Sequence, residues 1–249
     1  GPFATATDPG DGSYDLMLPA GTYDVTATAD GHAPFTSSNV PAVTGQTTPL
    51  DFDLAPYVQV LDDDVEGGNI GWTAQVPWAI TTESSSSPTH SWTDSPGGNY
   101  ADNRNVSLTS PLLDLTGMTG ATLQFSHIYD LETGYDYGHV EVSANGGTTW
   151  TNVASFNGIN YTAWETATIE VPELDGVATA RVRFRLETDG SVQEDGWHVD
   201  DIVVQASVPP TADFTLEATP GSAQICAGDA TDFTVVVGAI SGFANPVTL

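Results

Sequence analysis

Two adjacent carboxylates, Asp200 and Asp201, stand in the middle of the apolar stretch EDGWHVDDIVV, residues 194–204. An ionised carboxylate in a buried strand is too costly to leave without a partner. The chain has 33 acidic residues but no lysine and only four arginines, so its own cations cannot neutralise them. These residues therefore indicate a bound metal ion. A period of two would place the apolar residues on two faces, Trp197, Val199 and Val203 on one and Ile202 and Val204 on the other.

A second acidic run, LDDDVEGG, lies near residue 62. Asp64 and Glu66 are two positions apart, so in a strand they would share a face. Oxygen donors of this kind suit Ca²⁺, which takes about six to eight oxygens at about 2.3–2.6 Å.

Motifs for catalysis are absent from the sequence. It contains no H-E-x-x-H, no G-x-S-x-G and no C-x-x-C. We interpret the serine run 84–87 as a low-complexity loop, and we expect no catalytic residue and no enzyme activity in this chain. The histidines are interpreted as structural: His32, His90, His127, His139 and His198.

The formal net charge is −29 over 249 residues, which disfavours nucleic acid and anionic membranes as partners. No apolar run is long enough to span a membrane, and we expect the sequence to be a segment of a longer protein. A single cysteine, Cys226, offers no internal disulfide. The acid excess indicates exposure to salt or divalent cations, or a composition bias of the source lineage, and the sequence leaves both open.

The elements that must position these acids are strands. Runs rich in Thr, Val and aromatic residues alternate with Gly, Asn, Asp and Pro, and no long stretch keeps a helical period. We predict an all-β protein: a small β-sandwich, an antiparallel jelly-roll sandwich and part of an Ig-like sandwich. The expected segments are residues 1–56, 57–207 and 208–249.

The first segment contains DGSYDLMLPAGTYDVTATADGH, residues 11–32. This motif resembles the second half of a carboxypeptidase regulatory-like domain. We expect two strands joined at PAGTY, with each strand presenting one apolar face. The two faces consist of Tyr14, Leu16 and Leu18, and of Tyr23, Val25 and Ala27.

The middle segment combines SLTSPLLDLTGMTGATLQF, SHIYDLETGYDYGHVEVSANGGTTW and ARVRFRLETDGS. Together these motifs resemble the MAM-like jelly-roll domain of secreted proteases of the immune inhibitor A and bacillopeptidase F types, and the related cleaved-adhesin domains. Residues 139–153 are predicted to form a hairpin over an Asn-Gly-Gly turn. Arg181, Arg183 and Arg185 are predicted on one strand face, opposite Val182 and Phe184.

The resemblance implies bound calcium. It implies that the first and last strands of the segment are neighbours, which would join one set of ligands: Asp62, Asp64, Glu66, Asp200 and Asp201. It also implies that the loops SPGGNY, YDYG and DGW lie together. Their acids and amide could form a second calcium site or could be ordinary turn formers: Asp94, Asn99, Asp102, Glu132, Asp136 and Asp195.

The last segment, residues 208–249, resembles the opening strands of a bacterial Ig-like domain. Two strands are predicted, in DFTLEATP and DATDFTVVVGAI, with apolar residues at alternating positions. A complete sandwich of this kind needs about seven strands, so we expect this segment not to close a core of its own.

These patterns indicate a non-catalytic, calcium-stabilised accessory or spacer region of a secreted or cell-surface bacterial protein. Its expected partner is the catalytic domain of a parent protease, and adhesion or substrate docking is a further expected role. The alternative is a glycan-binding or cell-surface adhesin module, with Trp78 and Trp92 as the exposed aromatic candidates.

Overall fold

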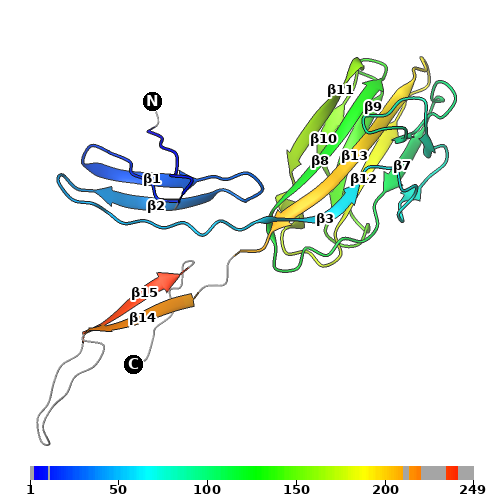
Figure 1. Cartoon of the computed structure of the whole chain (residues 1–249). Helices are drawn as coiled ribbons and strands as arrows, with labels where there is room; N and C mark the ends of the chain where they lie inside the picture. The colour runs from blue at the N-terminus through cyan, green and yellow to red at the C-terminus, as the bar shows by residue number, and fades with distance from the viewer. Residues whose placement is uncertain (1–2, 11, 210–212, 220–233, 241–249) are drawn as a thin grey trace, which may run out of the picture. The chain divides into compact units, whose positions relative to one another are not determined.

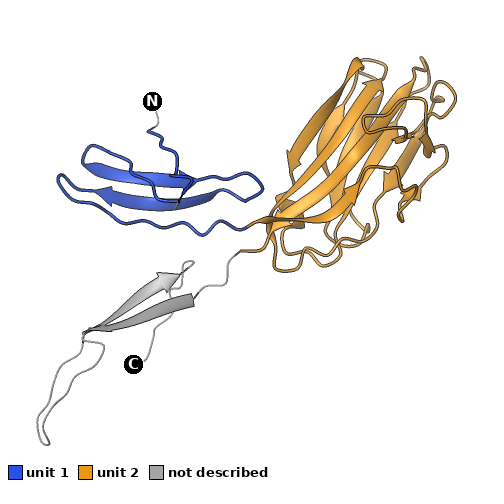
Figure 2. Cartoon of the chain, viewed as in Figure 1, with its two compact units in different colours: residues 1–55, 210–249 blue, residues 56–209 orange. Residues whose placement is uncertain are grey.

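The computed structural model describes residues 3–10, 12–209, 213–219 and 234–240, with backbone only for the last two ranges. The chain divides into two compact units, residues 56–209 and residues 1–55 with 210–249 (Figure 2). Strands are nearly the only regular secondary structure of the described residues, which confirms the all-β prediction. Within this part of the chain, no helix has the length and apolar character that crossing a bilayer requires.

In the first unit, β1 (Gly21–Ala27) pairs antiparallel with β2 (Phe35–Ala42). The predicted strand over Tyr14–Leu18 does not form, which corrects the expectation of two strands around PAGTY: β2 takes the place beside β1 instead. The Tyr14 hydroxyl donates to the Leu50 carbonyl at 2.5 Å, so a side-chain hydrogen bond holds this segment at Tyr14. Their half-buried side chains still alternate and line the same hollow as those of β1.

Two antiparallel sheets form the unit of residues 56–209 (Figure 1). One has the strand order β10-β9-β12-β7-β4, and the other has the order β11-β8-β13-β6-β5, with β3 also paired to β13. The strands are β3 (Tyr57–Asp63), β4 (Thr73–Ala74), β5 (Ala79–Thr81), β6 (Ser91–Thr93), β7 (Asn105–Thr109), β8 (Thr119–Asp130), β9 (Tyr137–Ser143), β10 (Thr151–Phe156), β11 (Ile159–Glu170), β12 (Arg181–Glu187) and β13 (Gly196–Ser207), with a 3-10 turn, η1 (Pro172–Leu174), before β12.

The core lies between these two sheets. Phe184 of β12 packs on Trp197 of β13 with ring centroids 5.5 Å apart, and both rings contact Phe125 of β8. All three side chains are fully buried. In β12, Val182, Phe184 and Leu186 are buried while the three arginines lie on the other face, as the alternation predicts. The predicted hairpin also forms, as β9 and β10.

The predicted adjacency of the first and last strands is confirmed, because β3 pairs with β13 from Tyr57↔Ser207 to Asp63↔Ile202. The predicted faces of β13 are wrong in one respect. Its register shifts between Asp200 and Val203, and Asp201 has a φ of 48°. A bulge of this kind inserts one residue and reverses the alternation. Hence one face buries residues from both predicted faces: Trp197, Val199, Ile202, Val204 and Ala206.

In the last segment, the predicted strands exist as β14 (Asp213–Thr219) and β15 (Thr234–Ile240), which pair antiparallel. Cys226 and the side chains of this segment lie outside the described residues.

Candidate metal centre

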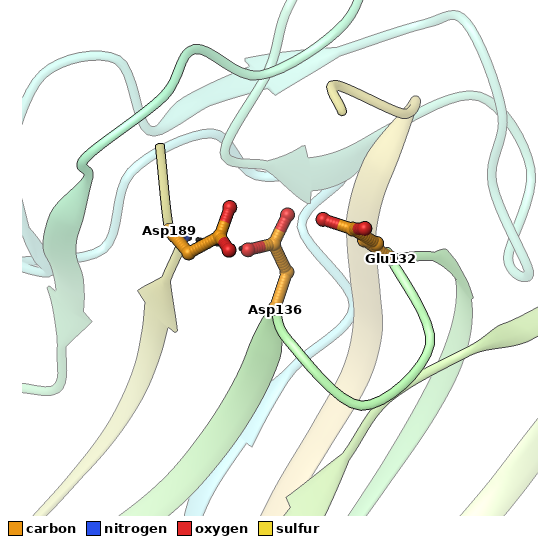
Figure 3. A group of neighbouring side chains, drawn as sticks. All are labelled: Glu132, Asp136 and Asp189. Atoms are coloured by element: carbon orange, nitrogen blue, oxygen red, sulfur yellow. Dashed lines mark hydrogen bonds between the residues drawn. The ribbon is translucent and has the colours of Figure 1, made fainter. Parts of the chain in front are cut away.

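One carboxylate cluster stands out among the described residues. Glu132, Asp136 and Asp189 each offer one oxygen, and these oxygens all lie within 4.8 Å of one another (Figure 3). Two oxygens on opposite sides of a calcium ion are about 4.6–5.2 Å apart, because each Ca–O contact is about 2.3–2.6 Å. The cluster therefore has the spacing of a calcium site.

The loop between β8 and β9 positions two of these acids. The backbone N–H groups of Tyr135 and Asp136 both donate to the Glu132 carbonyl, which closes a tight turn directly before β9. Leu131, the residue before the turn, is buried against Tyr100 and Leu186. This packing anchors the turn at its first residue.

The third acid follows β12. Asp189 N–H donates to Asp136 Oδ1 at 2.7 Å, which joins the β12–β13 loop to the β8–β9 turn. The Asp189 carbonyl in turn accepts from Asn103 N–H at 2.6 Å, and Thr188 exchanges hydrogen bonds with Arg104. The loops before β7, before β9 and before β13 are thus fastened together around the three carboxylates.

Two carboxylate oxygens of this cluster are buried without a hydrogen-bond partner. Asp136 is fully buried, and neither its Oδ2 nor Glu132 Oε2 has a hydrogen-bond partner. Burial raises the pKa of Glu132, and the charges of Asp189, Asp136 and Glu194 raise it further. The donors are all oxygens on loops, which fits Ca²⁺ better than Zn²⁺ or Mg²⁺, because zinc prefers nitrogen and sulfur and magnesium demands a rigid octahedron.

The other residues of the predicted second site lie in the neighbouring loops. Asn99 donates to the Gln193 carbonyl at 2.5 Å, and Asp102 accepts a hydrogen bond from the Gln193 amide. The three loops that the resemblance brings together therefore do meet. Sequence reasoning missed Asp189, although it directly follows a predicted strand in ARVRFRLETDGS, one of the motifs that carry the family resemblance.

Asp94 and Asp195 form a separate acidic pair. Asp94 is fully buried and accepts the Trp197 N–H at 2.7 Å, but its Oδ2 has no partner. Burial, with a smaller contribution from the charge of Asp195, raises the pKa of Asp94 to about 7. Asp195 Oδ2 lies 3.6 Å from His198 Nε2.

The hydrogen bonds of Asp200 explain how an acidic side chain is accommodated inside an apolar strand. Its Oδ2 accepts the backbone N–H groups of Ser86 and Ser87, at 2.8 and 3.0 Å, and its Oδ1 accepts the N–H of Asp201 at 2.8 Å. Asp200 lies at the bulge of β13, where pairing with β6 ends and pairing with β3 begins. In the structure, backbone donors of the serine loop satisfy this carboxylate.

The remaining acids of the predicted first site are divided among local contacts. Glu66 accepts from Thr89 Oγ1 and His90 N–H, both at 2.7 Å, while Asp62 and Asp64 are exposed. The buried acid of this run is Asp63, which sequence reasoning did not select. It accepts the Trp72 indole N–H at 2.7 Å. Among the described residues, these acids do not form a cluster like that of Glu132.

The prediction that Trp78 and Trp92 are exposed is wrong. They are 4% and 2% exposed and belong to the sandwich core, where Trp78 packs edge-on against Trp197. Of the histidines, His127 and His198 are buried in strands, and burial lowers the pKa of both.

Two family models match parts of this chain. Residues 2–55 match the carboxypeptidase regulatory-like domain, which confirms the resemblance of the first segment. Residues 135–205 match Reelin subrepeat B, a range that includes Asp136 and Asp189.

Bacillopeptidase F of Bacillus subtilis (strain 168) is 29% identical over 154 residues, which are 62% of this chain and 10% of that protein. The chain thus spans about a tenth of the length of this relative. Among solved structures, the K3 cleaved adhesin domain of Lys-gingipain from Porphyromonas gingivalis W83 is similar at 19% identity and a TM-score of 0.44, covering 60% of this chain and 100% of that chain. The CBM22-1 xylan-binding domain of Xyn10C from Paenibacillus barcinonensis is similar at 13% identity and a TM-score of 0.44, covering 60% and 95%.

Proposed function

We propose that this chain is a non-catalytic accessory region of a secreted bacterial protein, and that calcium bound at Glu132, Asp136 and Asp189 stabilises its β-sandwich. The observation that carries the proposal is the fully buried Asp136 carboxylate, which faces two further carboxylates and has an oxygen without a partner. Three acids held this close repel one another, and a divalent cation removes the repulsion.

The proposed role as an accessory region of a larger protein is supported by the similarity to Bacillopeptidase F. The region matching Bacillopeptidase F covers most of this chain and a small part of that protein. This arrangement fits a longer parent protease whose catalytic domain lies in another part of that parent protein. In such a parent, the sandwich would act as a spacer or docking region, and calcium outside the cell would keep it folded.

Thermal unfolding tests the metal proposal. Calcium at 100 times its Kd adds about 2.7 kcal/mol to the free energy of unfolding when it binds only the folded state. For a unit of this size the melting temperature rises by about 5–10 °C. Magnesium at the same concentration should have a smaller effect, because it demands a more regular ligand geometry.

Asp136→Asn should abolish the calcium effect. Asp114→Asn is the matched control, since Asp114 is exposed and an asparagine can still accept the Thr116 N–H that Asp114 accepts at 2.9 Å. The proposal fails if calcium leaves the melting temperature of the unaltered chain unchanged, or if both variants keep the full response.

A further inference from the structure

Four loops meet at the end of the sandwich that carries the acidic cluster: residues 94–104, 131–136, 157–158 and 188–195. The strand register places them together, because Asp130 pairs with both Ile159 and Gly196, and Glu187 pairs with both Asn105 and Tyr137. We refer to these four loops as the loop end. Loops that a rigid sandwich gathers at one end are a common place for binding residues.

Large apolar side chains are exposed at the loop end. Tyr135 is 62% exposed in the turn that carries Glu132 and Asp136, and Val192 is 48% exposed in the loop that carries Asp189. Ile159, the first residue after the third loop, is 73% exposed. Gly134 N–H donates to Asn157 Oδ1 at 3.3 Å, and Leu131 N–H donates to the Gly158 carbonyl at 2.9 Å. Those two bonds tie the Tyr135 turn to the loop before Ile159.

We propose that the loop end binds a neutral polysaccharide through the calcium ion. Two adjacent hydroxyl groups of one sugar would complete the coordination of the ion, and the Tyr135 ring would pack against the apolar face of the sugar. This inference rests on the proposed calcium site and names the class of ligand for it.

The site leaves room for such ligands. Three carboxylates supply at least three oxygens, and Ca²⁺ takes about six to eight. Glu132 and Asp189 are half-buried and Asp136 is fully buried, so a sugar would have to approach the ion from the side of Glu132 and Asp189. Positions that water would fill can be taken by hydroxyl oxygens, which are hard donors of the same kind.

Charge decides between classes of ligand. The formal net charge of the chain is −29, and further acids, Asp102, Glu194 and Asp195, lie in the same loops. One divalent ion does not reverse this field, so an anionic lipid surface or an acidic polymer is repelled. A neutral sugar polymer is not repelled, and an exposed aromatic ring gives it an apolar surface to contact.

Binding to immobilised polysaccharide, with and without EDTA, tests the inference. The probes are α-mannan and arabinogalactan, each intact and after periodate oxidation, which cleaves adjacent diols, and unbranched β-1,3-glucan, whose chain residues carry no adjacent diol and which should not bind. We expect the whole chain to bind at least one intact polymer bearing adjacent diols in calcium. EDTA and oxidation of that polymer should both abolish binding.

Tyr135→Ala should weaken binding by about tenfold or more and leave the calcium-induced rise in melting temperature unchanged. Leu112→Ala is the matched control: Leu112 is 54% exposed but lies beyond β7, at the other end of the sandwich, and its removal should change nothing.

Calcium stabilisation without binding to α-mannan or arabinogalactan overturns the inference and leaves the proposed function standing. Equal binding to oxidised polymer, or binding that persists in EDTA, overturns the role of the ion. Calcium-dependent binding to phosphatidylserine vesicles in place of polysaccharide assigns the loop end to lipid and also overturns it. A chain that calcium does not stabilise contradicts the proposed function itself.

Discussion

The backbone N–H of Ser87 donates to Asp200 Oδ2 at 3.0 Å, across 113 positions of sequence. The Ser87 hydroxyl also lies 3.0 Å from the carbonyl oxygen of Asp64 and 3.2 Å from Asp200 Oδ1. Ser87 thus joins the chain directly after β3 to the bulge of β13. The serine run is therefore bonded to β13 at the place where its pairing changes from β6 to β3.

Asp200→Ala should destabilise the sandwich by about 2–4 kcal/mol. The substitution leaves the backbone donors of Ser86, Ser87 and Asp201 without their acceptor, and partly buried unpaired donors are costly. Urea denaturation followed by tryptophan fluorescence measures the change. Asp62→Ala is the control, because Asp62 is an exposed acid of the adjacent strand and its removal should cost at most about 0.5 kcal/mol. Equal effects of the two variants would show that Asp200 does not anchor the loop.

Asp136→Asn should have opposite effects with and without calcium. In EDTA the variant should be more stable than the unaltered chain by about 1 kcal/mol, because one of three mutually repelling charges is gone. An amide oxygen can still accept the Asp189 N–H that Asp136 Oδ1 accepts. In saturating calcium the order should reverse, since only the unaltered chain gains the binding energy. Melting curves in the two buffers give both values, and a variant that is less stable in EDTA would contradict the repulsion argument.

Much of this fold is predictable from the alternation of apolar and polar residues along the strands. The buried and exposed faces of β12 follow the alternation of Val182, Phe184 and Leu186 with the arginines. The strand over Tyr14–Leu18 was predicted wrongly because its alternation is real but describes a half-buried segment held by the Tyr14 hydroxyl. Periodicity reports which side chains face an interior, and it does not report which backbone is the pairing partner.

The candidate site was only partly predictable for a related reason. Glu132 and Asp136 could be chosen because the family resemblance implies that their loop lies beside other acidic loops, but Asp189 joins them only through the pairing of β9 with β12. The face assignment for β13 failed at Asp201, where a single residue in the left-handed region shifts the register. Strict alternation of faces assumes a regular strand without a bulge. The burial of Ile202 on the same face as Val199 therefore could not be predicted from the alternation.

Asp94→Asn should stabilise the chain at alkaline pH and change little near pH 4. The pKa of the Asp94 carboxyl is about 7 in the folded state and 3.8 in the reference state, so the folded protein binds more protons between these values. Stability contributed by the neutral carboxyl is therefore present below about pH 4 and is lost as the pH rises through about 7. The corresponding gain for the variant above pH 8 is at most about 4 kcal/mol, at 1.36 kcal/mol for each pH unit.

The groups that face Asp94 set the design of this experiment. The charge of Asp195 contributes to its raised pKa, and His198 approaches Asp195. Measurements in EDTA from pH 4 to pH 8.5 cover both ends of the predicted change and limit any contribution of calcium. Since an asparagine can still accept the Trp197 N–H, a loss of stability at pH 8 would mean that Asp94 is held ionised by a cation, and the explanation by burial would be wrong.

Gly138→Ala should destabilise the sandwich by about 1–3 kcal/mol or more. A Cβ at this position would lie 2.6 Å from Trp197 Cε3, and Trp197 is fully buried between the two sheets with no room to retreat. Gly67→Ala is the matched control, because a Cβ there has no atom within 4 Å and the backbone is not in the left-handed region. That control should be neutral, or more stable by up to about 1 kcal/mol through the smaller entropy of its unfolded chain. Urea denaturation measures both variants, and a shift in tryptophan emission should accompany only the first. If Gly138→Ala were as stable as Gly67→Ala, the contact between β9 and Trp197 could not be as tight as the structure has it.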